Sequence, residues 1–480
     1  MEENLKQLQL PGNAIIKIAI YGPESTGKTT LCNQLADHFN TEWAPEFARD
    51  YLQQKWDSKK EICSPDDLLP IAIGQIKLEN SALQKANNYL FVDTCLMTTK
   101  VFSEMYYGFC DSKLDKAARK HKYDLFFLTN VDVPWKKDDL RDSPNDREIT
   151  FEKFKYSLIE NNKPFIVLTG NPETRFQQAI AIIEGLSKAK KLGFSSYDFL
   201  QILNSEVPIA KIENQLSIYK NGISKANLNR PALINDGILK LTDEEFQSYS
   251  SLFDSKKDNF KLKKFIPASG AASRMFKFLN EFLNEFDLEN ETINAYINRK
   301  NAIELTVFLA GLEKFPFYKS INNKLFEEFP DFKSWSKDQQ HYYFIKLMLD
   351  DNHFDFSNKP KGVLPFHQYP NQIVTPIEEH LKESVLYACA NGVSNLHFTV
   401  SETHKSQFES TLLKVKSKIE ETSGTKINIV FSHQKKHTDS IAVDSENKPF
   451  RNENGELVFR PGGHGAVSYT HLTLPTILRV

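Results

Sequence analysis

The residues with the clearest chemical potential form a glycine-rich stretch near the start of the chain. Residues 22–29 read Gly-Pro-Glu-Ser-Thr-Gly-Lys-Thr and match the P-loop pattern at every required position. In such a loop, backbone N–H groups surround a phosphate chain, a lysine neutralises its outer phosphates and a threonine hydroxyl holds Mg²⁺. A plain glycine turn is the alternative. We predict a nucleoside triphosphate site made by Gly22, Pro23, Glu24, Ser25, Thr26, Gly27, Lys28, Thr29 and Thr30.

An acidic residue ends an apolar run further along the chain. Tyr89-Leu-Phe-Val-Asp93 resembles a Walker B strand, which places a carboxylate beside the metal and the phosphates. Asp93 could hold Mg²⁺ together with Thr29, or accept a proton from an attacking hydroxyl. The alternative is an aspartate that only caps the following helix.

Two further groups of charged residues suit a phosphoryl-transfer site. Glu46, Arg49 and Asp50 lie at a predicted strand-to-helix junction, where polar groups often face substrate. Arg141 and Arg147 lie in or beside a charged, proline-containing loop that could close over phosphates, because arginine binds them through a bidentate fork. Solvated surface residues are the alternative for both groups.

The second half of the chain contains three similar loop patterns. An apolar strand ending at Pro267 is followed by the small residues Ala-Ser-Gly-Ala-Ala-Ser and then Arg274. Small residues let a triphosphate approach the backbone, although a tight turn with a solvated arginine is the alternative. Pro-Lys-Gly and Pro-Gly-Gly-His-Gly follow later. The candidates for a second nucleotide site are Ser269, Gly270, Arg274, Lys361, Gly463 and His464.

The elements that must position these residues alternate between strands and helices. Five apolar strands separated by helices predict a three-layer α/β domain with a parallel sheet over residues 1–187. A lysine cluster and a Gly/Ser break at 188–196 predict a linker. A second α/β domain is expected over 197–467, with a helical insert at about 275–350 and strands near 395–400 and 426–431.

Composition narrows the class of protein. The chain has 480 residues, 40% of them hydrophobic and 25% charged, which is typical of soluble globular proteins with two or three domains. A formal net charge of −2 gives no electrostatic case for nucleic acid. Five scattered cysteines, no signal peptide and no apolar run of spanning length favour a cytoplasmic protein without a membrane partner. The oligomeric state stays open.

The first half of the chain resembles a known family. Gly-Pro-Glu-Ser-Thr-Gly-Lys-Thr, Glu46-Phe-Ala-Arg49, Val-Asp93-Thr and Asp132-Val-Pro-Trp are similar to the ribosylnicotinamide-kinase-like ATPase domain of the bacterial NAD-biosynthesis regulator. The resemblance implies Mg²⁺-dependent transfer of phosphate from ATP to a nucleoside such as nicotinamide riboside. It implies catalytic roles for Lys28, Asp93, Glu46 and Arg141, and ATP binding with help from Arg147.

The second half resembles the family called domain of unknown function 4301. Its hallmark is Pro-Ala-Ser-Gly-Ala-Ala-Ser-Arg-Met at residues 267–275. The three loops are also similar to those of Rossmann-like nucleotidyltransferases that make sugar nucleotides. That similarity implies contacts of Arg274 with a triphosphate, Lys361 with an acceptor phosphate and His464 with a base or acceptor. An alternative function is an ATP-sensing module that regulates a sugar-nucleotide-pyrophosphorylase-like enzyme.

The last residues of the chain do not read like the rest. Residues 468–480 resemble a translated sequencing adapter, directly after a glycine loop. We expect the residues from about Val467 onward to be foreign and the natural protein to continue differently. A native stop codon directly after Val480 would contradict this expectation.

Overall fold

The chain folds into two compact units in a computed structural model that describes residues 2–9, 15–135, 146–223, 225 and 227–462. Unit 1 comprises residues 1–223 together with 441–459. Unit 2 comprises residues 224–440 and continues from residue 460. Unit 2 is therefore inserted into the chain of unit 1.

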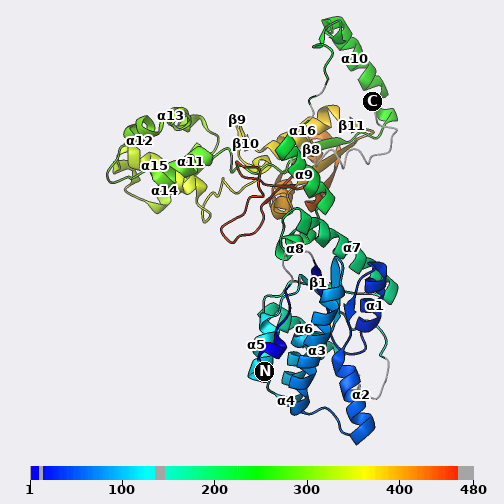
Figure 1. The fold of residues 1–480 in the computed structure, drawn as a ribbon. Helices are drawn as coiled ribbons and strands as arrows, with labels where there is room; N and C mark the ends of the chain where they lie inside the picture. The colour runs from blue at the N-terminus through cyan, green and yellow to red at the C-terminus, as the bar shows by residue number, and fades with distance from the viewer. Residues whose placement is uncertain (1, 10–14, 136–145, 224, 226, 463–480) are drawn as a thin grey trace. The chain divides into compact units, whose positions relative to one another are not determined.

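Unit 1 is built on a five-stranded sheet (Figure 1). All neighbouring strands run parallel, in the order β2-β3-β1-β4-β5, which confirms the five-stranded parallel sheet expected from the sequence. The carboxyl ends of the strands consequently meet at one edge. The strands are β1 (Ile16–Tyr21), β2 (Trp43–Ala44), β3 (Tyr89–Asp93), β4 (Leu125–Thr129) and β5 (Phe165–Leu168).

Helices cover both faces of this sheet (Figure 1). Alternating residues of β1 point to opposite faces: Ala19 and Tyr21 join one apolar core, and Ile18 and Ile20 join the other. The first core contains side chains of α3 (Pro65–Lys85), α4 (Leu96–Tyr107), α5 (Ser112–Lys120) and α6 (Arg147–Glu160). The second core contains α1 (Lys28–His38) and α7 (Pro172–Lys191), so the predicted three layers are confirmed.

The second core continues into two further helices and a returning segment. α8 (Ser196–Asn204) and α9 (Ile209–Asn221) pack beside α7, and Ile441 and Leu457 are buried in the same cluster. Gln201 Nε2 donates to the Leu457 carbonyl at 2.6 Å, and the Leu457 N–H donates to Gln201 Oε1 at 2.8 Å. Segments that precede and segments that follow residues 224–440 in the sequence therefore pack in the same unit as the P-loop. The domain boundary at 187–197 stays a sequence-based prediction.

An ion pair fastens the returning segment to α8. Arg451 donates to both carboxylate oxygens of Asp198, at 2.6 and 2.9 Å. Asp198 is only 5% exposed; burial favours a raised pKa, but the Arg451 guanidinium and the capping hydrogen bonds from Ser195 together hold the pKa of its carboxyl below the usual value. Loss of the Arg451 side chain would therefore leave the buried carboxylate of Asp198 without its ion-pair partner.

We expect Arg451→Leu to lower the free energy of unfolding of unit 1 by about 1.5–3 kcal/mol, since hydrogen bonds to a charged group are lost. The depressed pKa of Asp198 contributes stability at neutral pH that is lost as the pH falls through the folded-state value. The difference between wild type and variant should therefore shrink in acid. Urea unfolding at two pH values measures it.

Lys448→Ala is the matched control on the same segment, because Lys448 pairs with Glu446 and both side chains are about 70% exposed. We expect the control to change stability by less than about 1 kcal/mol. Equal effects of the two substitutions would contradict the role given to Arg451.

Unit 2 has a smaller sheet and a helical part. β8 (Lys264–Pro267) and β13 (Lys426–His433) pair in parallel with opposite sides of β12 (Val393–Val400), and β11 (Cys389–Ala390) pairs antiparallel with β12. Helices α16 (Pro376–Tyr387) and α17 (Lys405–Ser423) share an apolar core with this sheet. A second α/β region is therefore present, and its Rossmann-like character stays a prediction.

The helical insert expected at about 275–350 is present and has its own core, which is rich in phenylalanine. Its helices are α11 (Lys277–Glu285), α12 (Ile293–Lys300), α13 (Ile303–Ala310), α14 (Tyr318–Glu328) and α15 (Lys337–Leu349). The remaining short elements are the strands β9 (His367–Tyr369), β10 (Gln372–Val374), β14 (Ser440–Ile441) and β15 (Phe459–Arg460), and the 3-10 helices η1 (Glu2–Leu5), η2 (Lys257–Asn259), η3 (Leu312–Lys314), η4 (Phe332–Ser334), η5 (Lys361–Val363), η6 (Glu402–His404) and η7 (Lys436–Thr438).

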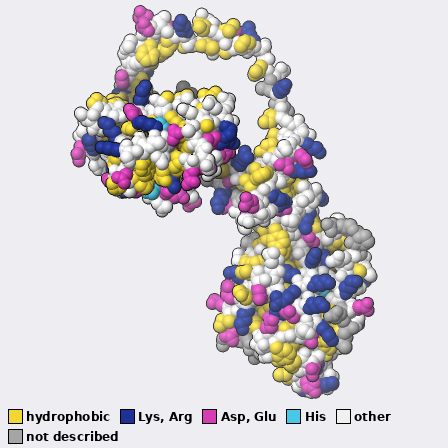
Figure 2. Space-filling model, turned by 90° about the vertical axis from the view of Figure 1, so that its left-hand side faces the viewer, with side chains coloured by type: hydrophobic (Ala, Val, Ile, Leu, Met, Phe, Trp, Pro, Cys, Tyr) yellow, Lys and Arg dark blue, Asp and Glu magenta, His cyan; other side chains and the backbone are white. Residues whose placement is uncertain are grey.

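One segment of unit 2 exposes many apolar side chains. β6 (Leu233–Ile234) and β7 (Gly237–Ile238) precede α10 (Asp243–Lys256), a helix in which no residue is buried. Phe246, Tyr249 and Phe253 are each more than 40% exposed, and hydrophobic side chains are visible along this segment (Figure 2). None of the helices in the described parts of the chain combines the length and apolar content needed to cross a membrane.

Candidate nucleotide site

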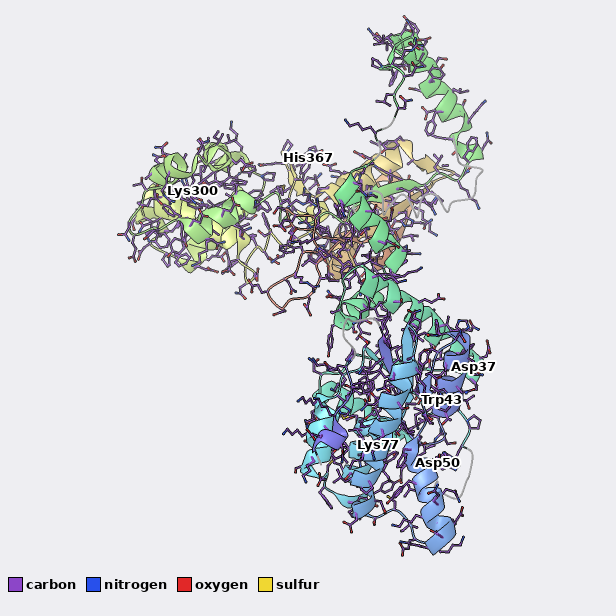
Figure 3. All side chains as sticks on the ribbon, in the orientation of Figure 1. Asp37, Trp43, Asp50, Lys77, Lys300 and His367 are labelled. Carbon is purple, nitrogen blue, oxygen red and sulfur yellow. The ribbon has the colours of Figure 1, made fainter. Side chains whose placement is uncertain are left out.

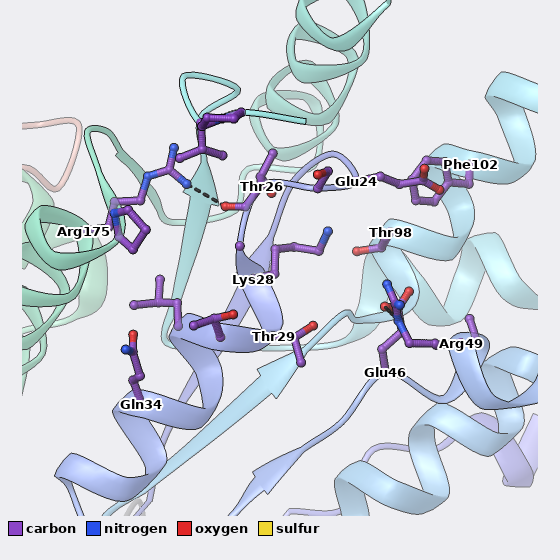
Figure 4. Close-up of a pocket in the computed structure, with 18 of the residues that line it drawn as sticks. Glu24, Thr26, Lys28, Thr29, Gln34, Glu46, Arg49, Thr98, Phe102 and Arg175 are labelled. Carbon is purple, nitrogen blue, oxygen red and sulfur yellow. Dashed lines mark hydrogen bonds and ion pairs between the residues drawn. The ribbon is translucent and has the colours of Figure 1, made fainter. Parts of the chain in front are cut away.

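The candidate site of unit 1 lies at the carboxyl edge of its sheet, where ligands of parallel α/β sheets bind. β1 ends at Tyr21 and leads into the P-loop, and Asp93, the last residue of β3, pairs in register with Ile20. A cavity of about 420 Å³ opens there (Figure 4). Its lining includes residues 24–31 of the P-loop and of α1, and the further side chains Gln34, Glu46, Ala48, Arg49, Leu52, Thr98, Phe102, Val133, Pro134, Pro172 and Arg175.

Glycines fix the backbone of the P-loop. Gly22 has a φ of +143°, and a Cβ there would lie 2.6 Å from Thr129 Oγ1, so a larger residue would collide with the end of β4. Gly27 has a φ of +82° with open space beside it, and it precedes α1 without a side-chain cap on that helix. Thr26 and Thr129 join their hydroxyls at 2.7 Å and brace the loop. The first N–H groups of α1 thus face a cavity suited to phosphate.

Lys28 and Thr29 line the cavity, and Asp93 lies directly behind Thr29. Lys28 Nζ donates to the Pro23 carbonyl at 2.8 Å, and Thr29 Oγ1 donates to Asp93 Oδ2 at 2.5 Å. The other oxygen of Asp93, Oδ1, is buried and has no hydrogen-bond partner among the described residues. Burial raises the pKa of Asp93 to about 6, against the opposing effect of Lys28. A buried carboxylate oxygen without a partner, beside a threonine hydroxyl, fits the ligand set of Mg²⁺.

Glu46 and Arg49 enter the cavity from the start of α2 (Phe47–Lys59). Gln75 on α3 holds this start in place, since its side chain accepts from the Phe47 N–H at 2.8 Å and donates to the Pro45 carbonyl at 3.1 Å. Glu46 Oε2 lies 3.8 Å from Arg49 Nε. Asp50 is exposed on the same helix (Figure 3) and is not part of the lining.

The structure describes one of the two arginines, Arg141 and Arg147, that were predicted to contact phosphate. Arg147, the first residue of α6, donates to the Val133 carbonyl at 2.7 Å and approaches the Ser25 carbonyl at 3.4 Å. Burial, with the nearby charge of Arg175, lowers the pKa of Arg147. Arg147 therefore lies beside the P-loop, as its proposed role in ATP binding requires. Arg141 lies outside the described residues, so its catalytic role stays a prediction.

Arg175 is the site residue that the sequence alone did not single out. It lies in the first turn of α7, is 3% exposed, and donates to the Thr26 carbonyl at 2.7 Å (Figure 4). It also donates to the Asn130 carbonyl at 2.8 Å and forms an ion pair with Asp132. Arg175 and Phe176 lie near the start of α7, and only the fold brings the Arg175 guanidinium to the P-loop. Arg175 therefore holds the P-loop in place through its hydrogen bond to the Thr26 carbonyl.

We expect Arg175→Met to weaken ATP binding about tenfold or more, because the bond to Thr26 is lost and Asp132 is left without its ion-pair partner. Titration with a fluorescent ATP analogue measures the dissociation constant. Arg119→Met is the matched control, since Arg119 pairs with Asp115 on the surface of α5, and it should bind the analogue like wild type. Unchanged affinity of Arg175→Met would contradict the bracing role.

Two threonines beside Asp93 also mark this edge. Thr94 has a φ of +75°, a conformation that β-branched residues rarely adopt and that occurs at functional sites. Thr98 lines the cavity from the first turn of α4. The hydroxyls of both are buried and have no hydrogen-bond partner within the described residues. These groups could contact a bound molecule.

The second set of predicted residues lies in unit 2. The Lys361 N–H donates to the Gly270 carbonyl at 3.0 Å, so these two loops are adjacent. Ser269 is partly buried, and Arg274 is exposed in the turn before α11 rather than in the first turn of that helix. Gly463 and His464 lie outside the described residues. The roles of this set stay predictions.

Two family descriptions match the chain. The family described as "AAA domain" matches residues 17–175, and the family described as "Domain of unknown function (DUF4301)" matches residues 195–470. Among curated proteins, the trifunctional NAD biosynthesis/regulator protein NadR of Salmonella typhimurium is 32% identical over 170 residues, which are 35% of this chain and 42% of that protein. NadR of Escherichia coli is 32% identical over 169 residues, 35% of this chain and 41% of that protein. The chain thus spans less than half the length of these relatives.

Solved structures similar to the chain include NadR protein in complex with NR, with a TM-score of 0.30 and 20% identity over 35% of this chain and 49% of that chain. NadR protein in complex with NAD and AMP-PNP has a TM-score of 0.29 and 20% identity, over 35% of this chain and 48% of that chain. Thymidylate kinase from Ehrlichia chaffeensis has a TM-score of 0.27 and 15% identity, over 35% of this chain and 99% of that chain.

The P-loop, the parallel sheet and the AAA match agree that unit 1 contains a nucleotide-binding domain, which is similar in sequence to the corresponding part of NadR. The longer match covers more than half of the chain. By that match the chain belongs to the domain of unknown function (DUF4301) family.

Proposed function

We propose that unit 1 is an ATP-dependent kinase that phosphorylates the hydroxyl of a nucleoside, with nicotinamide riboside as the favoured acceptor. One observation carries the proposal. The cavity has the P-loop on one side and Glu46, Arg49 and Phe102 on another, with Asp93 close to Thr29 of the loop. Such a cavity offers space for an acceptor next to the phosphates. The similarity to NadR, a protein named for NAD biosynthesis, supports the same reaction class.

The residues of the P-loop side would bind and orient the triphosphate. The N–H groups at the start of α1 and the Lys28 ammonium would neutralise the phosphates, and Arg147 would add charge beside Ser25. Thr29 and Asp93 would hold a Mg²⁺ ion, which supplies further charge neutralisation when bound. Catalysis would then rest on positioning and electrostatic stabilisation, as in other phosphoryl transfers.

The acceptor side would orient the nucleoside hydroxyl. Asp93 would accept its proton, since its Oδ1 has no hydrogen-bond partner within the described residues. Glu46 would accept hydrogen bonds from ribose hydroxyls, and the partly buried ring of Phe102 would pack against the base. The carboxylates of Glu46 and Asp93 would also favour the positive charge of nicotinamide riboside over neutral nucleosides.

The test is a kinase assay with ATP, Mg²⁺ and nicotinamide riboside, beside a panel of neutral nucleosides. We expect the monophosphate of nicotinamide riboside as product, with higher kcat/KM than for the panel. Tight ATP binding without phosphorylation of any nucleoside would refute the kinase and favour a module that only senses ATP. The comparisons with known proteins give that alternative no support.

The pH dependence of the reaction should report Asp93. Its pKa is raised to about 6 by burial, and only the ionised form can hold metal or accept a proton. We expect kcat/KM to fall about tenfold for each pH unit below about 6 and to be level above it. A profile measured between pH 5 and 8, at a Mg²⁺ concentration well below saturation, checks this, since bound Mg²⁺ would itself lower the pKa of Asp93. A profile that stays level from pH 8 down to pH 5 would show that ionisation of Asp93 does not control the rate.

A further inference from the structure

Four loops of unit 2 converge at the carboxyl edge of its sheet. The loop 268–273 follows β8, and its Ala268 N–H donates to the Thr399 carbonyl of β12 at 2.8 Å. The loop 359–363 lies against it through two backbone bonds of 3.0 Å, Lys361 N–H to Gly270 and Ala272 N–H to Lys359. We call this region the unit-2 edge. Its other two parts are residues 401–408 after β12 and residues 434–439 after β13.

Close packing brings these other parts to the same place. A Cβ on Gly362 would lie 2.7 Å from the Phe408 ring, so the loop 359–363 touches the first turn of α17 directly. His433, the last residue of β13, pairs in register with Val400, the last residue of β12. Gln434 donates to the Gly462 carbonyl, and the Gly462 N–H donates to Asp439 at 3.2 Å. The start of the third glycine loop is therefore held beside the end of β13.

Three polar side-chain atoms at the unit-2 edge are buried without a partner. His404 Nδ1, Gln407 Oε1 and His433 Nδ1 make no hydrogen bond within the described residues. Leaving buried polar atoms unpaired is destabilising, so native proteins rarely retain several together without a reason. They come from two different segments that the strand register brings together. A bound molecule with matching donors and acceptors would satisfy them.

The charges of the unit-2 edge indicate the class of molecule. Lys361 and Lys405 lie within its loops, and Lys361 is exposed; the exposed Arg274 directly follows the loop 268–273, and the exposed Arg460 lies two residues before Gly462. The acidic residues of the same loops are Glu402, which is exposed, and Asp439, which accepts from Gly462. The positively charged side chains outnumber the negatively charged ones, which favours binding of an anion at the unit-2 edge. Gln407 Oε1 can only accept, so the molecule must also carry a donor such as a hydroxyl.

We propose that the unit-2 edge binds a small molecule that carries both a phosphate group and hydroxyl groups. Arg274 and Lys361 contact the phosphate, His404 and His433 bind phosphate or hydroxyl oxygens, and Gln407 accepts from a hydroxyl. The open space beside Gly270 leaves room for the molecule against the backbone. This site is separate from the cavity of unit 1 and does not depend on the proposed kinase activity.

The test uses the full chain and three probes: ribose 5-phosphate, ribose and inorganic phosphate. Calorimetry should show binding of ribose 5-phosphate that is at least tenfold tighter than binding of either fragment. His433→Leu and Gln407→Leu should each weaken it about tenfold, because one hydrogen bond is lost. His367→Leu is the matched control, since His367 lies on β9 (Figure 3) and its side chain pairs with Glu379, and it should bind like wild type.

Lys28→Ala separates the two sites, because it removes the P-loop lysine and leaves the unit-2 edge intact. Binding that is lost in Lys28→Ala and kept in His433→Leu would overturn the proposal, as would a failure of ribose 5-phosphate to bind. Hydrogen exchange in wild type gives a readout that needs no variant. The probe should slow exchange in peptides spanning 268–274, 359–363, 401–408 and 431–435, and protection confined to the P-loop would overturn the proposal.

Discussion

Lys28→Ala is expected to lower kcat for nicotinamide riboside phosphorylation by about 10²–10³-fold. This is the usual effect of removing one preorganised charge that stabilises the phosphoryl group during its transfer. Lys28 is the only lysine that lines the cavity within the described residues, so no neighbouring ammonium can replace it there. In the structure its Nζ rests on the Pro23 carbonyl at 2.8 Å, within the loop itself. A coupled assay for ADP, with product identified by mass spectrometry, measures the effect.

Lys77→Ala is the matched control for this substitution, because Lys77 is exposed on α3 (Figure 3). It should leave kcat and KM unchanged. If Lys28→Ala and wild type formed product at equal rates, the P-loop would not be the phosphoryl-transfer site and the proposed function would fall.

Asp93→Asn is expected to lower kcat by about 10²–10⁴-fold, the range for loss of a general base. The amide keeps the shape of the side chain and can still accept from Thr29, but it has no negative charge for metal and no basic oxygen. The acid limb of the pH profile near 6 should disappear with it. Activity measured across Mg²⁺ concentrations distinguishes weakened metal binding from a lost base, since added Mg²⁺ rescues only the former.

The same substitution should stabilise the metal-free protein at neutral pH. Burial raises the pKa of Asp93 from 3.8 to about 6, so the folded chain holds a proton in this range that the unfolded chain has released. Stability therefore falls as the pH rises from about 4 to 6, and the cost persists above that. Asparagine avoids it, and we expect a higher Tm than wild type at pH 7.5 and no gain at pH 4. A lower Tm at pH 7.5 would contradict this.

The site residues predicted from sequence are those whose role is encoded locally. The P-loop pattern fixes Lys28 and Thr29 relative to the start of a helix, and a strand ending in an aspartate fixes Asp93. Because parallel strands end at one edge, adjacent β1 and β3 bring them together. Glu46 could be placed on the same argument, since it follows β2.

Residues that depend on long-range packing could not be predicted in the same way. Arg175 is 149 residues from Thr26, and nothing in its neighbourhood indicates that its guanidinium lies beneath the loop. Nothing in the sequence of segment 441–459 indicates that it contacts α8. In the structure, Arg451 donates hydrogen bonds to Asp198, and the Leu457 N–H donates to Gln201. In unit 2, nothing in the sequence indicates that the segments of His404 and His433 are neighbours, and only the register of β12 and β13 places them together.

The insertion of unit 2 has a consequence for how the protein is made. The core around α7 and α8 includes Ile441 and Leu457, which leave the ribosome only after residues 224–440 have been synthesised. At about 5–20 residues per second, that interval lasts roughly 10–40 seconds. During this interval, the apolar side chains of α8 and α9 that will pack against Ile441 and Leu457 lack these partners. Synthesis of the nucleotide-binding unit thus begins before residues 224–440 and is completed only after them.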